Sequence, residues 1–297
     1  MSLTRSQFDI LELLATTKET LSQRMLEERS GFALGKVNKV SKELKELGYI
    51  EDGAITAKGI DALEPYRAKR AIFIAAGFGS RLVPVTLNTP KPLVRVCGKR
   101  IIDTLIDAVL SAGIEDIYIV RGYLAEQFDQ LLYKYPMIKF LENPVYNEAN
   151  NISSAVIARY LMQNAYVLES DLVISNPSII KKYHYHSDVL GIWKDRTDDW
   201  CLTVDKDNCV TEEKVGGLDC YQMVGIYYWN EEDGKKLSVH LKEAYEEPGG
   251  KERYWETVPN QAYKGQYKVE VLPCKDDDIV EIDTFRELKA IDKTYDV

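Results

Sequence analysis

From residue 71 onward, short apolar runs alternate with longer stretches whose apolar positions recur every three to four residues. The short runs predict buried strands, and the longer stretches predict helices that cross between them. Strands are expected over 71–75, 114–120, 138–141 and 165–168, and helices over 101–112, 124–133 and 152–162. Strands joined by crossover helices form a parallel sheet that is covered on both faces. The pattern therefore predicts an α/β fold with a mostly parallel, Rossmann-like sheet, whose ligands bind at the carboxyl ends of its strands.

The front of the chain has a different pattern. Three helical stretches, the second beginning near Leu21 and the third running over 34–47, are followed by a short hairpin with a turn at Asp52-Gly53 and by a helix over 56–63. This order resembles that of the winged helix-turn-helix family. We expect a winged-helix domain over 1–66, a linker over 67–70 and a larger domain over 71–297.

Composition is that of an ordinary globular protein of 297 residues, with 45% hydrophobic and 29% charged residues. No apolar stretch approaches the ~20 residues that cross a bilayer, and the first residues lack the apolar core of a secretion signal. We therefore expect a cytoplasmic protein without a membrane partner. The five cysteines include no C-x-x-C pair, which argues against a zinc site or a disulfide framework. His184 and His186 are interpreted as a solvated pair.

Charge is distributed unevenly between the two parts. Residues 1–70 carry 12 basic and 11 acidic residues, a balance of +1, which leaves 26 basic and 36 acidic residues, a balance of −10, in the rest. Within the front part, Lys36, Lys39, Lys42 and Lys45 form a basic stripe on the predicted 34–47 helix. Such a stripe can neutralise DNA phosphates. A solvated helix surface and a docking or homodimer module are the alternatives.

A glycine-rich segment follows the first strand of the predicted sheet. It reads Ala75-Ala76-Gly77-Phe78-Gly79-Ser80-Arg81 and is followed by Pro90-Lys91-Pro92. Glycines let backbone N–H groups curl around phosphates. Arg81 offers a forked donor for a leaving pyrophosphate, and Lys91 offers a point charge for the phosphate under attack. The two cations are our candidate catalytic residues.

Two groups of carboxylates are candidates for a divalent metal. Asp171 ends the strand predicted over 165–168, at the same sheet edge as the glycine segment. In Glu281-Ile282-Asp283, alternation along a strand places both carboxylates on one face. Because Mg²⁺ prefers carboxylate oxygens, we expect Asp171, Asp283 and Glu281 to bind it.

The glycine segment with its P-K-P resembles the signature of nucleotide-sugar-type nucleotidyltransferases. Within that superfamily, residues 70–292 are most similar to bacterial choline-phosphate cytidylyltransferases. Further points of similarity are Arg121-Gly122-Tyr123, the segment Asn150 to Ser154, Asp199-Trp200 and Tyr254-Trp255. The resemblance implies nucleotide binding by Ala75, Ala76, Gly77, Gly79, Ser80, Arg81, Tyr123, Asn151 and Ser154. It implies an acceptor pocket built by Trp200, Tyr254 and Glu281, in which aromatic faces and a carboxylate receive a trimethylammonium group.

The resemblance predicts transfer of a cytidylyl group from CTP to phosphocholine, giving CDP-choline and pyrophosphate. Sugar 1-phosphates, phosphoethanolamine and aminoalkylphosphonates are alternative acceptors. An aminoalkylphosphonate needs the carboxylates but fewer aromatic rings. A winged-helix transcription regulator with a nucleotide-sensing domain is an alternative of another class.

Overall fold

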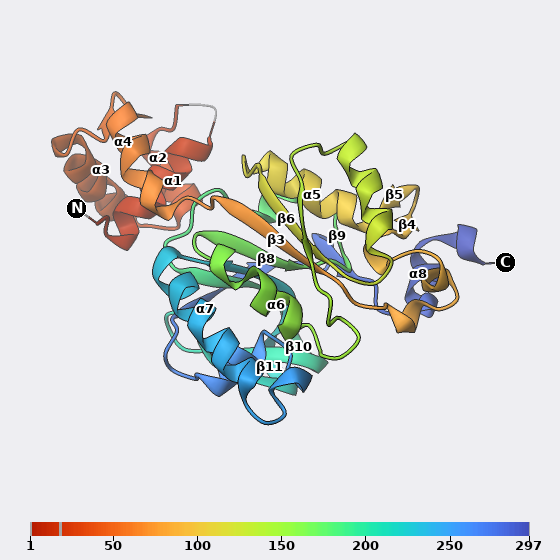
Figure 1. Ribbon diagram of the computed structural model, residues 1–297. Helices are drawn as coiled ribbons and strands as arrows, with labels where there is room; N and C mark the ends of the chain where they lie inside the picture. Colours follow the sequence, from red (N-terminus) through yellow and green to blue (C-terminus); the bar gives the residue numbers. More distant parts are fainter. Residues whose placement is uncertain (1, 18–19, 297) are drawn as a thin grey trace. The chain divides into compact units, whose positions relative to one another are not determined.

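The computed structural model describes residues 2–17 and 20–296, which divide into two compact units, 1–67 and 68–297 (Figure 1). The smaller unit contains α1 (Arg5–Thr16), α2 (Gln23–Ser30), α3 (Leu34–Glu46), β1 (Ile50–Glu51), β2 (Ala54–Ile55) and α4 (Ala57–Leu63). Side chains of Thr4, Ser22 and Thr56 cap three of the helices. Its core is formed by buried side chains of α1, α3 and α4, among them Ile10, Leu11, Val37, Leu44 and Leu63.

The larger unit is built on a seven-stranded sheet in the order β12-β10-β11-β8-β3-β6-β7. The strands are β3 (Arg70–Ala75), β6 (Asp116–Arg121), β7 (Lys139–Glu142), β8 (Ala165–Glu169), β10 (Ser187–Val204), β11 (Val210–Trp229) and β12 (Val269–Cys274). All neighbouring pairs are parallel except those that β11 makes with β8 and β10. The predicted α/β fold with a mostly parallel sheet is confirmed.

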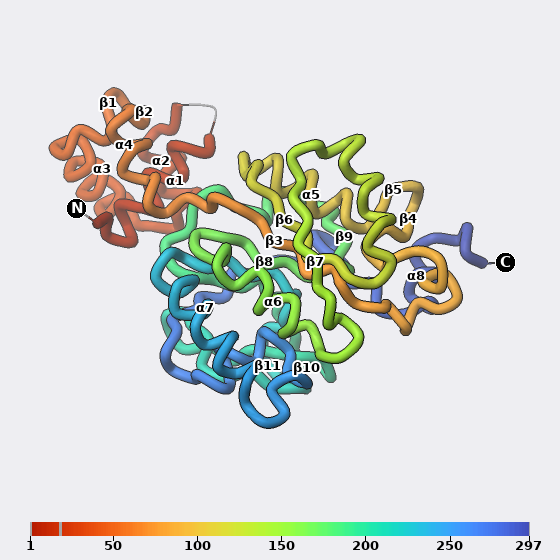
Figure 2. The backbone as a smooth tube through the Cα atoms, in the orientation of Figure 1, coloured from red at the N-terminus to blue at the C-terminus, as the bar shows by residue number. Residues whose placement is uncertain are grey.

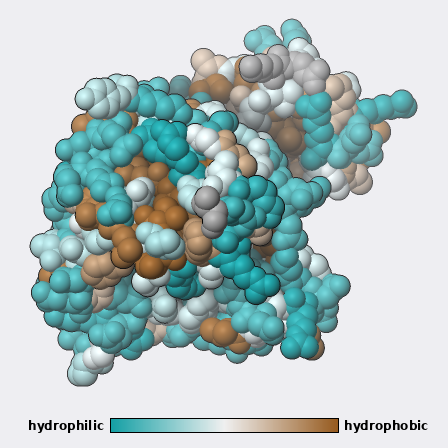
Figure 3. Space-filling model, turned by 90° about the vertical axis from the view of Figure 1, so that its right-hand side faces the viewer, coloured by the Kyte–Doolittle hydropathy of each residue, from teal (hydrophilic) through white to brown (hydrophobic). Residues whose placement is uncertain are grey.

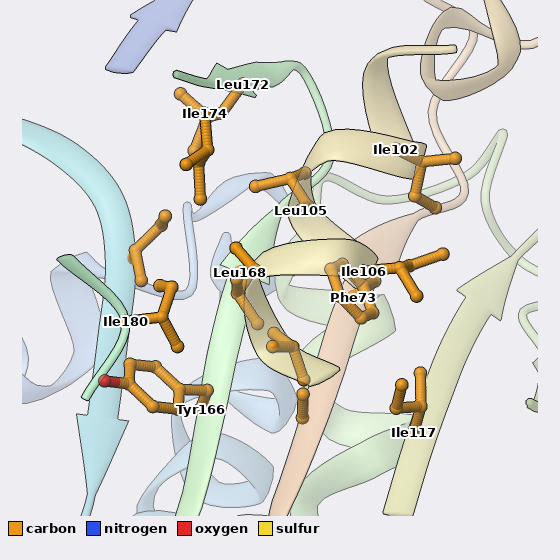
Figure 4. Packing of buried hydrophobic residues seen from close by; sticks show 14 of the residues in the cluster. Phe73, Ile102, Leu105, Ile106, Ile117, Tyr166, Leu168, Leu172, Ile174 and Ile180 are labelled. Carbon is orange, nitrogen blue, oxygen red and sulfur yellow. The ribbon is translucent and has the colours of Figure 1, made fainter. Parts of the chain in front are cut away.

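Helices cover both faces of this sheet, as Figures 1 and 2 show. On one face α5 (Ile101–Ser111) directs Ile102, Leu105 and Ile106 toward the sheet, where Phe73 and Leu168 meet them (Figure 4). On the other face lie α6 (Ile152–Ala158) and α7 (Glu231–Glu246), which share a second apolar cluster with strand residues such as Ile72. Successive residues of β3 thus serve opposite cores, as the two-residue period of a strand requires.

Two small sheets and one more helix complete the unit. β9 (Leu172–Ile174) pairs with β13 (Ile279–Glu281), and β4 (Arg95–Val96) pairs with β5 (Lys99–Arg100). α8 (Phe285–Ile291) follows β13 and begins with a capping box made by Thr284 and Glu287. The β9–β13 pairing joins segments more than 100 residues apart in the sequence and brings the chain after β8 beside the chain near 283.

Two local predictions were wrong, and a third holds in modified form. The segment expected as a helix over 124–133 is a 3-10 helix over Ala125–Tyr133, after Leu124 in the left-handed region at φ 47°. The helix beginning at Ile152 stops at Ala158 and continues as a 3-10 turn over Arg159–Leu161. His184 is buried, not solvated. Its ring stacks on Tyr228, and its Nδ1 lies 2.5 Å from Asp188 Oδ2, which gives the buried ring a polar partner.

None of the described helices is long and apolar enough to cross a membrane. The face in Figure 3 shows predominantly hydrophilic side chains around one area where apolar residues gather. This view looks at the side of the molecule toward which β3 runs in Figure 1.

Candidate active site

The glycine segment follows β3 and packs against the segment that carries Lys91. Gly79 has φ +62°, and a Cβ at this position would lie 2.9 Å from Lys91 Cβ and 3.1 Å from Thr86 Cγ2. Thr86 also donates a hydrogen bond from its hydroxyl to the Gly79 carbonyl, at 2.8 Å. Only glycine satisfies both the backbone angle and the close approach. The glycine therefore fixes Lys91 next to the loop.

Lys91 and Arg81 converge on two of the predicted metal ligands. Lys91 Nζ lies 2.8 Å from Asp171 Oδ2 and 2.9 Å from Asp283 Oδ1. Arg81 forms a bidentate ion pair with Asp283, in which each terminal nitrogen lies 2.7 Å from a carboxylate oxygen. Burial acts to lower the pKa of Lys91, but Asp171 and Asp283 outweigh it and raise the pKa above its ordinary value. Lys91 therefore carries its positive charge at neutral pH.

The third predicted ligand joins the same cluster. Oxygens of Asp171, Glu281 and Asp283 all lie within 4.8 Å of one another. The β9–β13 pairing produces this arrangement, because Glu281 pairs with Leu172 and the Ile282 N–H donates to the Asp171 carbonyl at 3.1 Å. Burial, together with the charges of Asp171 and Asp283, raises the pKa of Glu281 to about 8.

This carboxylate cluster suits a hard divalent cation. Asp171 Oδ1 is buried and, among the described residues, has no hydrogen-bond partner, so it offers an unused acceptor toward the cluster. Mg²⁺ takes carboxylate oxygens and keeps several waters. Asp171, Glu281 and Asp283 together fit such an ion.

Two cavities meet at Asp171. The first, of about 310 Å³, lies against the glycine segment. Of the predicted residues it is lined by Ala75, Ala76, Gly77, Gly79, Lys91, Asn151, Ser154 and Asp171. Its remaining walls include Asn143, which donates from Nδ2 to the hydroxyls of Ser153 and Ser154 at 3.0 Å, and Tyr146.

The second cavity, of about 330 Å³, contains the predicted acceptor residues. Trp200 and Tyr254 stand on its wall with ring centroids 6.1 Å apart and planes inclined by 64°. Arg81, Asp171, Glu281 and Asp283 also line it. The two cavities share Asn150, Asn151, Glu169 and Asp171.

Three predicted nucleotide-binding residues do not line the first cavity: Tyr123, Ser80 and Arg81. Tyr123 donates from its hydroxyl to the carbonyls of Thr86 and Leu87, at 3.0 and 3.2 Å, and its ring packs on Phe78. Ser80 begins a 3-10 turn and is exposed. Arg81 borders the second cavity rather than the first.

Sequence reasoning missed three acids of the second cavity: Glu169, Glu213 and Glu256. Asn151 Nδ2 donates to Glu169 Oε1 and Glu256 Oε2, both at 3.2 Å, and the Trp255 indole donates to Glu169 Oε1 at 2.9 Å. Burial raises the pKa of both Glu169 and Glu256. The signal available was weak: Glu169 stands two residues before Asp171, and Glu256 directly follows Tyr254-Trp255.

A glycine loop at the carboxyl end of β3, two cations and three clustered acids are the groups that an enzyme of phosphate-group transfer requires. Residues 70–192 match the family described as "Nucleotidyl transferase". A "2-aminoethylphosphonate cytidylyltransferase" of Lancefieldella rimae is 37% identical over 228 residues, 76% of this chain and 92% of that protein. The chain therefore belongs to the nucleotidyl transferase family.

Other relatives agree with this assignment. A "Choline-phosphate cytidylyltransferase" of Haemophilus influenzae is 31% identical over 224 residues, 74% of this chain and 95% of that protein. Among solved structures, the CTP:phosphocholine cytidylyltransferase of Streptococcus pneumoniae superposes with a TM-score of 0.69 at 28% identity, covering 77% of this chain and 99% of that one. An inositol-1-phosphate CTP transferase from T. maritima, with a TM-score of 0.62 at 18% identity, shares the fold.

Proposed function

We propose that this enzyme transfers a cytidylyl group from CTP to a small aminoalkylphosphonate, of which 2-aminoethylphosphonate is the simplest candidate, and releases pyrophosphate. The observation that carries the proposal is the composition of the second cavity. Apart from the three acids of the metal cluster, it sets four carboxyl groups around a single aromatic pair: Glu169, Asp199, Glu213 and Glu256. Such a pocket suits a primary ammonium, whose N–H groups donate to carboxylates. The 37% identical relative acts on an acceptor of this type.

The chain's own residues supply positioning and charge for the reaction. The first cavity receives the nucleotide, with its triphosphate over the backbone of Gly77 and Gly79. An oxygen of the acceptor phosphonate, already ionised at neutral pH, forms a bond to the α-phosphorus while the bond to the pyrophosphate oxygen breaks. Lys91, charged and held beside Asp171, stabilises negative charge on the phosphorus under attack. No proton has to be removed from the nucleophile, so no general base is required.

The acids have a defined part in this scheme. Asp171, Glu281 and Asp283 would hold Mg²⁺, which when bound neutralises charge on the phosphates and orients them. Asp171 borders both cavities, so it stands where the two substrates meet. Arg81 borders the acceptor side and is more than half exposed, which leaves it free to exchange Asp283 for a phosphate oxygen.

Pyrophosphate release measured for each nucleoside triphosphate against a panel of acceptors tests the proposal. The panel contains 2-aminoethylphosphonate, phosphoethanolamine, phosphocholine and a hexose 1-phosphate. We expect CTP with 2-aminoethylphosphonate to give the highest kcat/KM. Preference for phosphocholine would assign the activity to choline phosphate, which the Trp200–Tyr254 pair and the 31% identical relative support. Turnover of the hexose phosphate alone, or of no acceptor, would contradict the proposal.

For the smaller unit we propose binding to duplex DNA through α3, as a winged helix-turn-helix domain. The side chains of Lys36, Lys39, Lys42 and Lys45 are exposed, whereas Val37, Val40, Ser41 and Leu44 face the core. The first nine residues of α3, 34–42, contain three of these lysines and no acid. Helix-turn-helix proteins present this amino-terminal half to the major groove.

Gly35 is a further reason to place the DNA contact on the first turn of α3. It is exposed in the first turn of α3, and a Cβ there would meet nothing within 4 Å, so no packing within the unit requires glycine. Glycine inside a helix costs about 1 kcal/mol relative to alanine. A residue without a side chain allows a close approach of DNA at this position. Glu43, by contrast, accepts a hydrogen bond from Gln7 Nε2 at 3.1 Å and lies outside the acid-free stretch 34–42.

Fluorescence anisotropy with a labelled 30-base-pair duplex and the full chain tests this proposal. We expect micromolar binding at 50 mM salt that weakens steeply by 200 mM, with a slope reduced by about 1 for each lysine removed. Lys39→Glu with Lys42→Glu should abolish binding, whereas Lys235→Glu on α7 should not. Equal affinity for single-stranded RNA, or no binding at 50 mM salt, would overturn the proposal.

A further inference from the structure

Glu213 is a buried carboxyl on the wall of the second cavity. It lies on β11, and only 6% of its surface is exposed. The side chain of Asn260 donates to Oε2 at 2.5 Å, and that of Gln261 donates to Oε1 at 3.2 Å. Both donors come from the π-helical turn over Val258–Ala262. The two oxygens are therefore held in place, one by each amide.

No cation balances this carboxyl within the described part of the chain. Lysine, arginine and histidine nitrogens form ion pairs with many of the acids, but none with Glu213. The nearby acid Glu256 adds repulsion, and burial is the main reason that the pKa of Glu213 rises to about 7. A buried charge is ordinarily paired, since leaving it unpaired carries a large desolvation penalty. An acid kept in this environment at the wall of a substrate cavity is therefore suited to a cation that arrives with a ligand.

Building on the proposed function, we infer that Glu213 binds the primary ammonium of the acceptor and selects it against a trimethylammonium group. A primary ammonium has three N–H donors and can give one or two of them to the fixed oxygens of Glu213. A trimethylammonium group has no N–H donor and is stabilised by aromatic faces instead. Because Asn260 and Gln261 hold the carboxyl in the wall, it cannot withdraw from the added methyl groups.

The groups around Glu213 define the charge that the ammonium meets. Glu256 faces Glu213 from the segment that follows the 3-10 turn Gly250–Glu252. Tyr227 faces Glu213 from the same strand, β11. Asn260 and Gln261 are neutral. Entry of a cation into this set favours the ionised carboxylate, so acceptor binding should weaken as pH falls from 8 to 6 and Glu213 takes up a proton.

Glu213→Gln and Glu212→Gln form a matched pair for the test. Glu212 is the preceding residue on β11, exposed and paired with Lys214 at 3.1 Å, and its side chain points to the opposite side of the strand. In steady-state assays with CTP, Glu213→Gln should raise the KM for 2-aminoethylphosphonate about 10- to 100-fold with little change in kcat. The kcat/KM ratio of 2-aminoethylphosphonate to phosphocholine should fall by a similar factor. Glu212→Gln should leave both quantities unchanged.

Two further readouts separate recognition from a structural role. Glu213→Asp keeps the charge and should recover part of the lost selectivity. The rise in KM between pH 8 and pH 6 should be smaller in Glu213→Gln than in the wild type, and Glu281, which lines the same cavity and has a pKa of about 8, accounts for the part that remains. Equal losses for both acceptors in the Gln and Asp variants, or wild-type selectivity in Glu213→Gln, would overturn this inference while the proposed function stands. A wild-type chain that turns over neither acceptor overturns both.

Discussion

Asp171 is the residue on which the geometry of the site converges. It accepts from Lys91 through one oxygen, keeps the other oxygen unpaired among the described residues, and borders both cavities. These roles depend on its charge more than on its packing. A change that keeps its shape and removes its charge therefore isolates its chemical part.

Asp171→Asn should lower kcat by about 10²- to 10³-fold or more, the size of effect seen when a group that stabilises transition-state charge is removed. Its melting temperature should stay within a few degrees of wild type, because the amide fills the same space. Pyrophosphate release and circular dichroism measure the two quantities. Asp277→Asn, in the exposed turn before β13, serves as the control and should behave as wild type. Near-normal turnover by Asp171→Asn would remove this residue from the site.

Glu213 should destabilise the fold at high pH. Its folded-state pKa, about 7, lies above the ordinary value of 4.5, so the folded state holds the proton more tightly than the unfolded state. The stability that this proton contributes is complete below about pH 4.5 and is lost as pH rises toward 7. Glu213→Gln avoids that loss.

We therefore expect Glu213→Gln to stabilise the larger unit at pH 8, by on the order of 1–3 kcal/mol, and to have little effect at pH 5. Calorimetric melting temperatures at the two pH values measure the difference. Glu212→Gln provides the comparison, because Lys214 lowers the pKa of that exposed acid and its removal should bring no gain. A variant less stable than wild type at pH 8 would show that the hydrogen bonds from Asn260 and Gln261 outweigh the burial of charge.

The glycine segment shows how one element positions the cation of another. Gly77 and Gly79 both line the first cavity, but their surroundings differ. A Cβ on Gly77 would meet nothing within 4 Å, whereas a Cβ on Gly79 would collide with Lys91 and Thr86 at a positive φ. Only Gly79 is required by the packing of the segment.

Gly79→Ala should therefore displace Lys91, lower kcat by about 10²-fold and destabilise the fold by about 1–3 kcal/mol. Gly77→Ala should keep the melting temperature of wild type, and any effect should be confined to the KM for CTP. Thermal melts and steady-state kinetics of the two variants provide the measurement. Equal kinetic losses in both variants would argue against a role of Gly79 in placing Lys91.

Local sequence patterns predicted the elements that carry the chemistry. The strand before Gly77, the helix after Arg100 and the acids at 171 and 283 follow from runs and spacings that can be read along the chain. Glu213 and Glu256 could not be found in this way. Their environment is created by the pairing of β10 with β11 and by the turn at 258–262, and neither leaves a local signal. The same reason applies to His184, which lies before β10 and stacks on Tyr228 of β11.

At the scale of the whole molecule, the larger unit alone has about the length of the match to a curated relative. The match to the Lancefieldella rimae protein spans 228 residues and 92% of that protein, and the larger unit here has 297 − 67 = 230 residues. Every residue of both cavities also belongs to the larger unit.

A chain shortened to residues 68–297 should therefore fold and keep a kcat within about twofold of the full chain, since catalysis is a property of the site's own positioned groups. Soluble expression, a cooperative thermal melt and pyrophosphate release measure this. A folded but inactive fragment would show that the smaller unit contributes to catalysis.

The wall common to the two cavities limits how such an enzyme can diversify. Under the proposed function, Asn150, Asn151, Glu169 and Asp171 border the nucleotide and the acceptor at once, so a mutation there that admits a new acceptor would also disturb the nucleotide. Trp200 and Glu213 line the second cavity alone and lie on β10 and β11. Changes confined to this long hairpin would thus exchange one acceptor headgroup for another and leave the nucleotide side of the site unchanged.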